Sequence, residues 1–489
     1  MTNEFSIGFE TLSKEIAIDQ LPISGTIPDW LEGTLVRNGP AEFQIGKRPF
    51  NTWLDGMAML HKFAFKDGVV SYANKYIESN TYKKNHKHNT IEVGEFATDP
   101  CRTLFQRVYA FFNPQFTDNT SVNIGNIADK YIAMTETSIP IEFDIDTLKT
   151  LGHLDYSGEV SGKITTAHPH YDFDRGETYN YTTHMVGIRS HYKIFRIPDG
   201  SSERILLSSL PVWEPSYMHS FAMTENYIIL AEFPLVVYSL VLLGGITLLD
   251  KPFITNYSWK PESGTRFQVV RKSDGKLMAT RKCEAFFAFH HINAFEVTED
   301  DGEVKIVLDL AAFDSSSVIN ELYLDELRQA DPNPITPGQF RRYTLSLEHE
   351  TVEKRVITHQ NIELPRINYR HYNARPYNYA YGISVTEGEG WFNQLAKIEI
   401  ADEKDFVWSE PHCYPGEPVF IPRPDATAED DGLILSVVLN AQDKTSFLLI
   451  LDAQTFKEVG RATVPLSIPF GFHGQYLPLI KPEDTSTCA

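Results

Sequence analysis

Residues 143–152 read Phe143-Asp144-Ile145-Asp146-Thr147-Leu148-Lys149-Thr150-Leu151-Gly152, and residues 451–460 read Leu451-Asp452-Ala453-Gln454-Thr455-Phe456-Lys457-Glu458-Val459-Gly460. The two stretches share the pattern Asp-x-x-Thr-x-Lys-x-x-Gly. Each is typical of a hairpin in which the aspartate can accept backbone N–H bonds two residues on, before the strand resumes. The same hairpin at two distant places indicates a small β-sheet unit that the chain repeats.

Three further stretches read as two strands around an Asp-Gly turn, at residues 63–72, 267–280 and 294–308. Repeated antiparallel hairpins at wide spacing predict an all-β fold of the β-propeller type, whose closure removes most sheet edges. A pair of β-sandwich domains is the alternative. Because no Ser/Gly/Pro-rich linker or charge run marks a boundary, we expect a single domain over residues 1–489.

Helical patterns are few. Residues 318–330 have apolar side chains near helical spacing and end before Pro332. The apolar residues 233–249 could form a helix, and so could residues 104–112. The first of these two is shorter than the roughly 20 residues that a spanning helix needs, and it contains Pro234, so we expect no transmembrane span.

The composition restricts the class of partner. The chain has 489 residues, of which 42% are hydrophobic and 12% aromatic, so it can build a large core. Its net charge of −21 and its pI near 5.2 disfavour a polyanion, and we therefore expect no nucleic-acid partner. The same charge leaves apolar contact as the only attraction to an anionic membrane surface.

The cysteines and the N-terminus indicate a reducing compartment. Cys101, Cys283, Cys413 and Cys488 lie far apart without Cys-x-x-Cys spacing, which argues against a disulfide framework and against a thiolate metal site. Residues 1–6 lack the basic-then-apolar order of a signal peptide. We therefore expect a cytoplasmic protein.

Four histidines lie in apolar or aromatic surroundings at widely separated positions: His168, His219, His290 and His473. A polar group buried without a partner costs about 1–3 kcal/mol. A single such residue is usually a core histidine whose ring nitrogens are both hydrogen-bonded. Four of them predict a fold that returns repeatedly to one axis and binds a metal there.

Four neutral imidazoles leave the charge of a metal uncompensated, so such a site needs carboxylates that accept the other ring N–H. Glu136, Glu363 and Glu417 are the candidates, because each has apolar neighbours and no adjacent cation. All-imidazole coordination suits iron, copper, zinc or nickel. Because catalytic zinc usually has three protein ligands, four histidines favour octahedral iron with two positions open for dioxygen and substrate.

At these residues the chain resembles the carotenoid cleavage oxygenase family, and the resemblance covers nearly the whole length. The motifs that carry it are Glu32–Pro40, Trp53–Phe63, Thr135–Thr137, Thr166–Asp172, Pro215–Phe221, Phe289–Phe295, Gly416–Phe420, Glu429–Gly432 and Phe472–Gly474. Asp99–Arg102 and Glu321–Arg328 also resemble the animal branch, which contains the β-carotene oxygenases and the retinal-pigment-epithelium isomerohydrolase. Leu54 departs from the pattern, since many members have an aromatic residue there.

The resemblance implies a seven-bladed β-propeller with a few short helices on its active-site face and one Fe²⁺ per chain on its axis. Carried over position by position, the ligands are His168, His219, His290 and His473, and the carboxylates behind them are Glu136, Glu363 and Glu417. Neither His170 nor His291 falls on a ligand position. The implied activity is cleavage of a carotenoid or apocarotenoid double bond by dioxygen into two carbonyl products such as retinal, with the 15,15′ bond favoured.

Other functions stay open at this point. A retinyl-ester isomerohydrolase would use the same iron as a Lewis acid without consuming dioxygen, and a stilbene-cleaving relative would accept phenolic stilbenes. A β-propeller binding module without activity is the non-enzymatic alternative. Because an enzyme for water-insoluble polyenes needs a route from the bilayer, residues 233–249 and 104–112 predict a peripheral membrane contact at the mouth of a tunnel.

Overall fold

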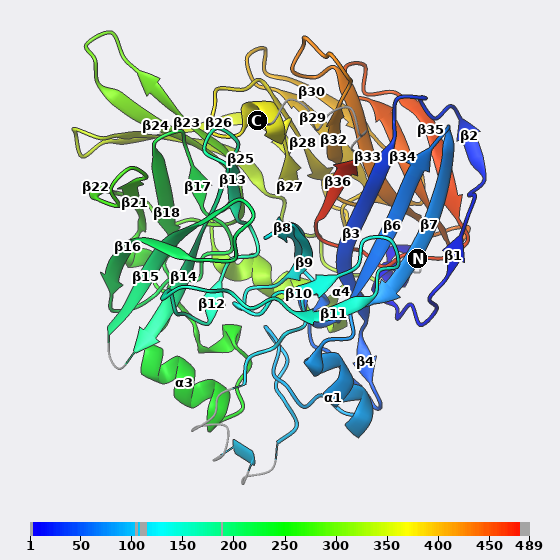
Figure 1. The fold of residues 1–489 in the computed structure, drawn as a ribbon, viewed down its shortest axis with the longest axis horizontal. Helices are drawn as coiled ribbons and strands as arrows, with labels where there is room; N and C mark the ends of the chain where they lie inside the picture. The colour runs from blue at the N-terminus through cyan, green and yellow to red at the C-terminus, as the bar shows by residue number, and fades with distance from the viewer. Residues whose placement is uncertain (1–2, 103–105, 108–114, 187–188, 480–489) are drawn as a thin grey trace.

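The computed structural model describes residues 3–102, 106–107, 115–186 and 189–479, and within these it contains seven sheets of four to six strands around one axis (Figure 1). The first three sheets are β1 (Ala17–Ile18), β7 (Val69–Tyr76), β6 (Met57–Lys66), β3 (Gly33–Glu42) and β36 (Gly474–Pro478); β11 (Thr150–His153), β10 (Ile141–Phe143), β9 (Lys130–Met134) and β8 (Asn123–Ile127); and β12 (Ile164–Thr165), β13 (His170–Asp172), β14 (Glu177–Val186), β15 (Arg189–Pro198) and β16 (Ile205–Val212).

The fourth, fifth and sixth sheets have four strands each. They are β17 (Ala222–Met223), β18 (Tyr227–Glu232), β21 (Thr265–Arg271) and β22 (Leu277–Cys283); β23 (Phe287–Thr298), β24 (Val304–Phe313), β25 (Gln339–Ser346) and β26 (Val352–Asn361); and β27 (Glu363–Arg366), β28 (Tyr379–Ser384), β29 (Gln394–Glu399) and β30 (Lys404–Trp408). The seventh contains β2 (Ile23–Gly25), β35 (Glu458–Val464), β34 (Thr445–Asp452), β33 (Gly432–Asn440), β31 (Cys413–Pro415) and β32 (Val419–Pro422). Two ribbons, β4 (Gln44–Ile45) with β5 (Arg48–Pro49) and β19 (Leu235–Val236) with β20 (Ser258–Trp259), lie outside the ring.

The two ends of the chain close this ring. Strand β36 pairs antiparallel with β3, from Gly33 opposite Pro478 to Arg37 opposite Gly474, and the early strand β2 completes the seventh sheet against β35. Closure pairs strand edges that would otherwise be free. The seven-bladed propeller is therefore confirmed, and the alternative of two β-sandwich domains is wrong. That one domain spans all of residues 1–489 stays a prediction, since residues 480–489 lie outside the described part.

The expected hairpins form, and the repeated turn has one geometry in both places. Asp67 and Gly68 have φ angles of 51° and 73°, as a two-residue turn between twisted strands requires. In the repeated turn, an Asp144 carboxylate oxygen accepts the backbone N–H of Thr147 at 2.8 Å, and Asp452 accepts that of Thr455 at 2.8 Å. The carboxylates thus reach the residue three positions on, which corrects the expected two.

The helices are shorter than their sequence patterns suggest. In the described residues they are α1 (Asn80–His88), α3 (Ser239–Thr247), α4 (Leu324–Leu327), α5 (Tyr369–Tyr372) and the 3₁₀ turns Glu4–Phe9, Trp53–Asp55, Ile254–Asn256, Pro261–Ser263 and Ser316–Leu322. The pattern at 318–330 is split because Tyr323 is extended, with ψ of 134°. Within residues 233–249 only α3 is helical, because the preceding residues Leu235–Val236 form strand β19. Residues 104–112 lie almost entirely outside the described residues.

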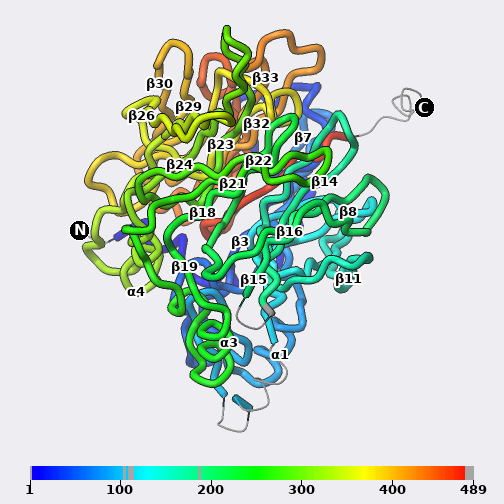
Figure 2. Tube along the Cα trace, turned by 90° about the vertical axis from the view of Figure 1, so that its left-hand side faces the viewer, coloured from blue at the N-terminus to red at the C-terminus, as the bar shows by residue number. Residues whose placement is uncertain are grey.

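Two of these helices lie together at one end of the molecule. Figures 1 and 2 show α1 and α3 at the narrow end, below the sheets. Five apolar or aromatic side chains at and around α3 are more than a third exposed, namely Tyr238, Leu240, Val241, Leu248 and Leu249. Within the described part of the chain, no helix has both the length and the apolar character that crossing a bilayer requires.

Candidate metal centre and cavity

The four histidines singled out in the sequence meet at one point. His168 follows β12, His219 precedes β17, His290 is in β23 and His473 directly precedes β36, so four different parts of the ring contribute. One nitrogen from each ring lies within 4.8 Å of the other three. The Nε2 atoms of His168 and His219 are 3.0 Å apart, and those of His290 and His473 are 3.3 Å apart. Because the strands come from different sides of the ring, this point lies on the propeller axis.

Three of the imidazoles are held from behind by the three predicted carboxylates. The Nδ1 atoms lie 2.7 Å from Glu136 for His219, 2.6 Å from Glu363 for His290 and 2.7 Å from Glu417 for His473. For His168, the described residues provide no carboxylate partner. An ionised carboxylate only accepts, so each of these Nδ1 atoms carries the proton and donates it.

This tautomer decides what the centre can bind. When Nδ1 carries the proton, Nε2 of a neutral imidazole has a lone pair. The Nε2 atoms of His290 and His473, 3.3 Å apart, are then both acceptors and cannot bond to each other. A cation between them removes this repulsion. With metal–nitrogen distances of about 2.1 Å, two nitrogens at right angles are about 3.0 Å apart, which fits the spacing found here.

The charge of Glu417 is fixed by two arginines. Its side chain is fully buried and forms an ion pair with Arg37, while the guanidinium of Arg366 lies 3.5 Å from Oε1. The backbone N–H of Gly474 also donates to Oε2 at 3.0 Å. Burial alone would raise the pKa of Glu417, but Arg366, His473 and Arg37 together lower it to about 2. This carboxylate is therefore an anion at neutral pH.

The other two carboxylates have different partners. Glu136 accepts a hydrogen bond from the hydroxyl of Tyr217 at 2.8 Å, on the same oxygen that faces His219. Glu363 accepts the backbone N–H of Leu364 at 2.8 Å, and its Oε1 is buried without a partner among the described residues. No arginine or lysine in the described part forms an ion pair with either. Their two negative charges thus match the charge of a divalent cation.

Burial keeps His168 and His473 neutral. It lowers the pKa of His168 well below the ordinary value, and the neighbouring His473, His219 and His290 act in the same direction. Burial likewise lowers the pKa of His473 to about 3, although Glu417 opposes this. Neutral imidazole is the form that binds a metal, so these two rings need not lose a proton before an ion enters.

Local irregularities in two strands aim the side chains inward. The pairing of β23 with β24 shifts register between Ala288 and His291, and that of β27 with β28 shifts after Glu363. A bulge of this kind turns a side chain that regular pleating would direct elsewhere. Nothing in the sequence marks either bulge.

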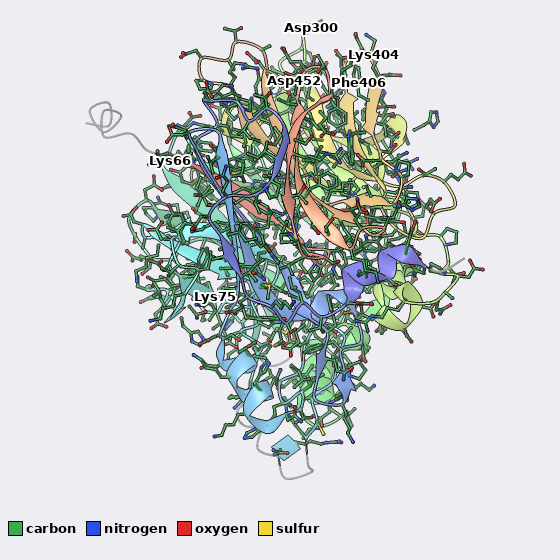
Figure 3. All side chains as sticks on the ribbon, turned by 90° about the vertical axis from the view of Figure 1, so that its right-hand side faces the viewer. Lys66, Lys75, Asp300, Lys404, Phe406 and Asp452 are labelled. Carbon is green, nitrogen blue, oxygen red and sulfur yellow. The ribbon has the colours of Figure 1, made fainter. Side chains whose placement is uncertain are left out.

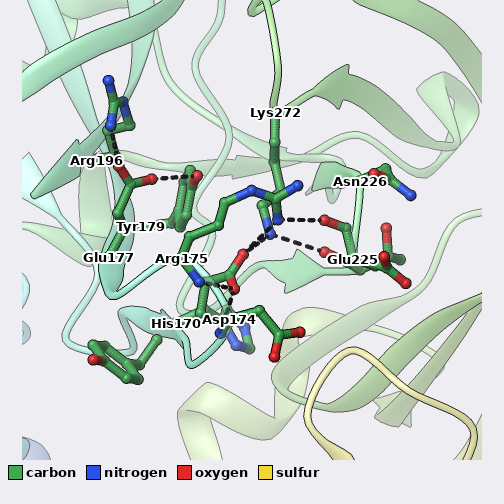
Figure 4. A network of polar contacts seen from close by, with 12 residues as sticks. His170, Asp174, Arg175, Glu177, Tyr179, Arg196, Glu225, Asn226 and Lys272 are labelled. Atoms are coloured by element: carbon green, nitrogen blue, oxygen red, sulfur yellow. Dashed lines mark hydrogen bonds and ion pairs between the residues drawn. The ribbon is translucent and has the colours of Figure 1, made fainter. Parts of the chain in front are cut away.

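The two histidines next to ligand positions point elsewhere, as the resemblance implies. His170 lies 2.9 Å from the carbonyl oxygen of Phe221 and 3.1 Å from the hydroxyl of Tyr369. It borders a network, shown in Figure 4, in which Lys272 and Arg175 both bind the carboxylate of Asp172. His291 is half-buried, with its Nδ1 2.8 Å from the hydroxyl of Ser220.

A cavity opens beside the four histidines. His219, His290 and His473 line it, as do Glu136 and Glu363. Most of the remaining wall is apolar or aromatic, including Trp53, Leu54, Phe96, Val122, Phe253, Phe289, Phe313, Val318, Leu322, Phe392 and Phe472. Most of this wall could not be predicted from the sequence, because its residues come from many separate segments of the chain. Leu54, the departure from the family pattern, faces the cavity.

Fold and site together define a β-propeller protein with a cluster of four histidines that could hold a metal ion beside an apolar cavity. The family described as retinal pigment epithelial membrane protein matches residues 9–478, and the chain belongs to this family. It is 35% identical to the carotenoid-cleaving dioxygenase, mitochondrial, of Macaca fascicularis, over 93% of this chain and 91% of that protein. It is also 35% identical to the beta,beta-carotene 15,15′-dioxygenase of Gallus gallus, over 93% and 95%.

A further relative is the carotenoid isomerooxygenase of Galleria mellonella, which is 34% identical over 93% of both chains. Among solved structures, cobalt-substituted ACO of Synechocystis superposes with a TM-score of 0.83 at 25% identity, over 97% of this chain and 98% of that one. These similarities extend over the full ring, so they include every sheet that contributes to the metal centre.

Proposed function

We propose that the protein is a non-haem iron dioxygenase that cleaves a polyene double bond of a carotenoid or apocarotenoid into two carbonyl products. The observation that carries this proposal is the set of four imidazoles whose ring nitrogens converge beside an apolar cavity. Relatives named as carotenoid-cleaving dioxygenases support the reaction class.

Iron fits the four histidines better than zinc does. Four nitrogen ligands leave two positions of an octahedron open, and zinc in catalytic sites usually has three protein ligands. When bound, Fe²⁺ would supply the redox chemistry with dioxygen. His168, His219, His290 and His473 would hold it, and Glu136, Glu363 and Glu417 would orient three of the rings.

The residues of the chain itself bind and place the substrate. Three of the ligand histidines line the cavity and His168 does not, so the open side of the centre faces the space where a polyene would lie. The aromatic wall excludes water and holds a rigid apolar chain by contact area. Phe289, whose ring centroid is 5.6 Å from that of His219, forms the part of the wall next to this ligand ring.

The 15,15′ bond, with retinal as product, is the favoured site of cleavage. This preference is supported by relatives that are named beta,beta-carotene 15,15′-dioxygenase. The test is mass analysis of products after the iron-loaded protein is incubated with β-carotene, an apocarotenal, a retinyl ester and a phenolic stilbene. Dioxygen-dependent carbonyl products from a polyene support the proposal. Ester cleavage without dioxygen, cleavage of the stilbene alone, or binding without turnover would each replace it with the corresponding alternative.

The narrow end of the molecule is proposed to touch membranes. Exposed Leu240, Val241 and Leu249 lie on or beside α3, and Ile246 of the same helix lines the cavity. Large exposed apolar groups at the entrance to an apolar cavity suit transfer of a lipid-soluble substrate. Figure 3 shows the labelled charged residues Asp300 and Lys404 at the opposite end, which would face water. The cytoplasmic location stays a prediction.

A further inference from the structure

One wall of the cavity has a buried acid that the metal centre does not use. Glu95 lines the cavity and is only 6% exposed. Its Oε1 accepts a hydrogen bond from the hydroxyl of Thr117 at 2.8 Å, and its backbone N–H donates to the carbonyl of Thr98 at 2.9 Å. In the described part of the chain, no lysine, arginine or histidine forms an ion pair with it. Burying an ionised carboxyl group in this way costs free energy. The cost is avoided if the group is neutral or forms a hydrogen bond with a polar ligand.

The surroundings of Glu95 favour the neutral acid. Burial raises its pKa well above the ordinary value, and the nearby carboxyl groups of Asp55 and Asp118 raise it further, against the opposing hydrogen bond from Thr117. A neutral carboxylic acid has one O–H to donate. Since Thr117 uses an acceptor position, that donor is left for a molecule in the cavity.

Glu95 is connected to the histidine cluster through packed and hydrogen-bonded neighbours. The next residue, Phe96, packs its ring 5.5 Å from that of Tyr217, and the Tyr217 hydroxyl holds Glu136 behind the ligand His219. Thr117 is tied to the same region, because its carbonyl accepts the hydroxyl of Thr137 at 2.8 Å. Glu95, His219 and His290 line the same cavity, so a polyene beside the histidines can extend along the wall that contains Glu95.

From this placement we infer that Glu95, oriented by Thr117, donates a hydrogen bond to an oxygen atom of the substrate. The preferred substrate is then a polyene with an oxygen function, such as an apocarotenoid aldehyde or alcohol or a hydroxylated carotenoid, and not a pure hydrocarbon. This inference rests on the proposed function and specifies its substrate class. A hydrocarbon in the same place would leave the buried acid without a partner, and sites that hydrogen-bond a substrate discriminate strongly against analogues that lack the group.

The test compares β-carotene with an apocarotenal on the iron-loaded wild type, Glu95→Leu and Glu95→Gln. The matched control is Glu92→Gln, because Glu92 is on the same segment, does not line the cavity and pairs with His88 at 2.9 Å. The wild type should prefer the apocarotenal by about tenfold or more in kcat/KM. Glu95→Leu should lose that preference through KM, while Glu95→Gln and the control keep it, since an amide can also donate.

A second measurement separates this inference from the proposed function. Quenching of tryptophan fluorescence in the metal-free protein reports binding of the two polyenes without turnover. Weaker binding of the apocarotenal to Glu95→Leu alone supports the inference even if no polyene is cleaved. Equal preference in wild type and Glu95→Leu, in both measurements, overturns it while leaving polyene cleavage intact. Thr117→Val, which removes the group that orients Glu95, gives the same test if the leucine variant does not fold.

Discussion

Glu417→Gln should destabilise the metal-free protein far more than Glu363→Gln, although both carboxylates hold a ligand imidazole. The Arg37 and Glu417 side chains are 6% and 0% exposed, so the substitution leaves a buried guanidinium without its anion. Removing one partner of a buried ion pair costs about 3–5 kcal/mol. Glu363 has no arginine or lysine partner among the described residues, and the loss there should be about 1 kcal/mol.

The assay is urea unfolding of both variants after chelation, which removes the contribution of metal binding. Iron affinity is then measured separately and should fall roughly 10–100-fold in each variant, because each loses the carboxylate that orients a ligand ring. A double-mutant cycle of Arg37→Met with Glu417→Gln should give a coupling energy of about 1 kcal/mol or more. Equal destabilisation by the two glutamine variants, or a coupling near zero, would refute the assigned role of the arginine.

Three further outcomes follow from the same structure. His219→Ala should lose most bound iron and activity, as metal analysis of the purified variant would reveal; full iron occupancy would exclude this residue as a ligand. Changing the exposed Leu240, Val241 and Leu249 to Ser should abolish flotation with liposomes, and flotation of the wild type should persist at high salt because apolar contact is not screened. Burial raises the pKa of Asp55 to about 6, above the value of about 4 in an unfolded chain, so the unfolding free energy of the metal-free protein should fall as pH rises from about 4 to 6. Asp55→Asn should show a shallower fall across that range, and an unchanged slope would contradict the assignment.

The positions changed in the membrane variant could be chosen only from the structure. Within the apolar residues 233–249, the pattern does not show which side chains face outward. Leu242 looks equivalent to its neighbours in sequence, yet it is 2% exposed and belongs to the core, whereas Leu240 is 57% exposed. Serine at the buried position would test stability and not membrane contact, so only the exposed positions are informative.

The sequence by itself determined the hairpins and the residue types of the metal centre. A turn such as Asp67-Gly68 depends on backbone angles and hydrogen bonds within a few residues, so local chemistry is enough to predict it. The four histidines could be singled out because an imidazole in apolar surroundings needs partners for its ring nitrogens. Motifs close to each of them also carried the family resemblance.

Only the tertiary structure decided which groups act on one another. The two imidazoles of His290 and His473 that face each other are 183 residues apart, and Arg37 and Glu417 are 380 residues apart. Contacts over such separations depend on how seven sheets close around the axis and on bulges that turn single side chains. The role of Glu95 likewise exists only through Thr117 and the cavity wall, because a glutamate in sequence is usually a solvated one and burial is a property of the whole fold.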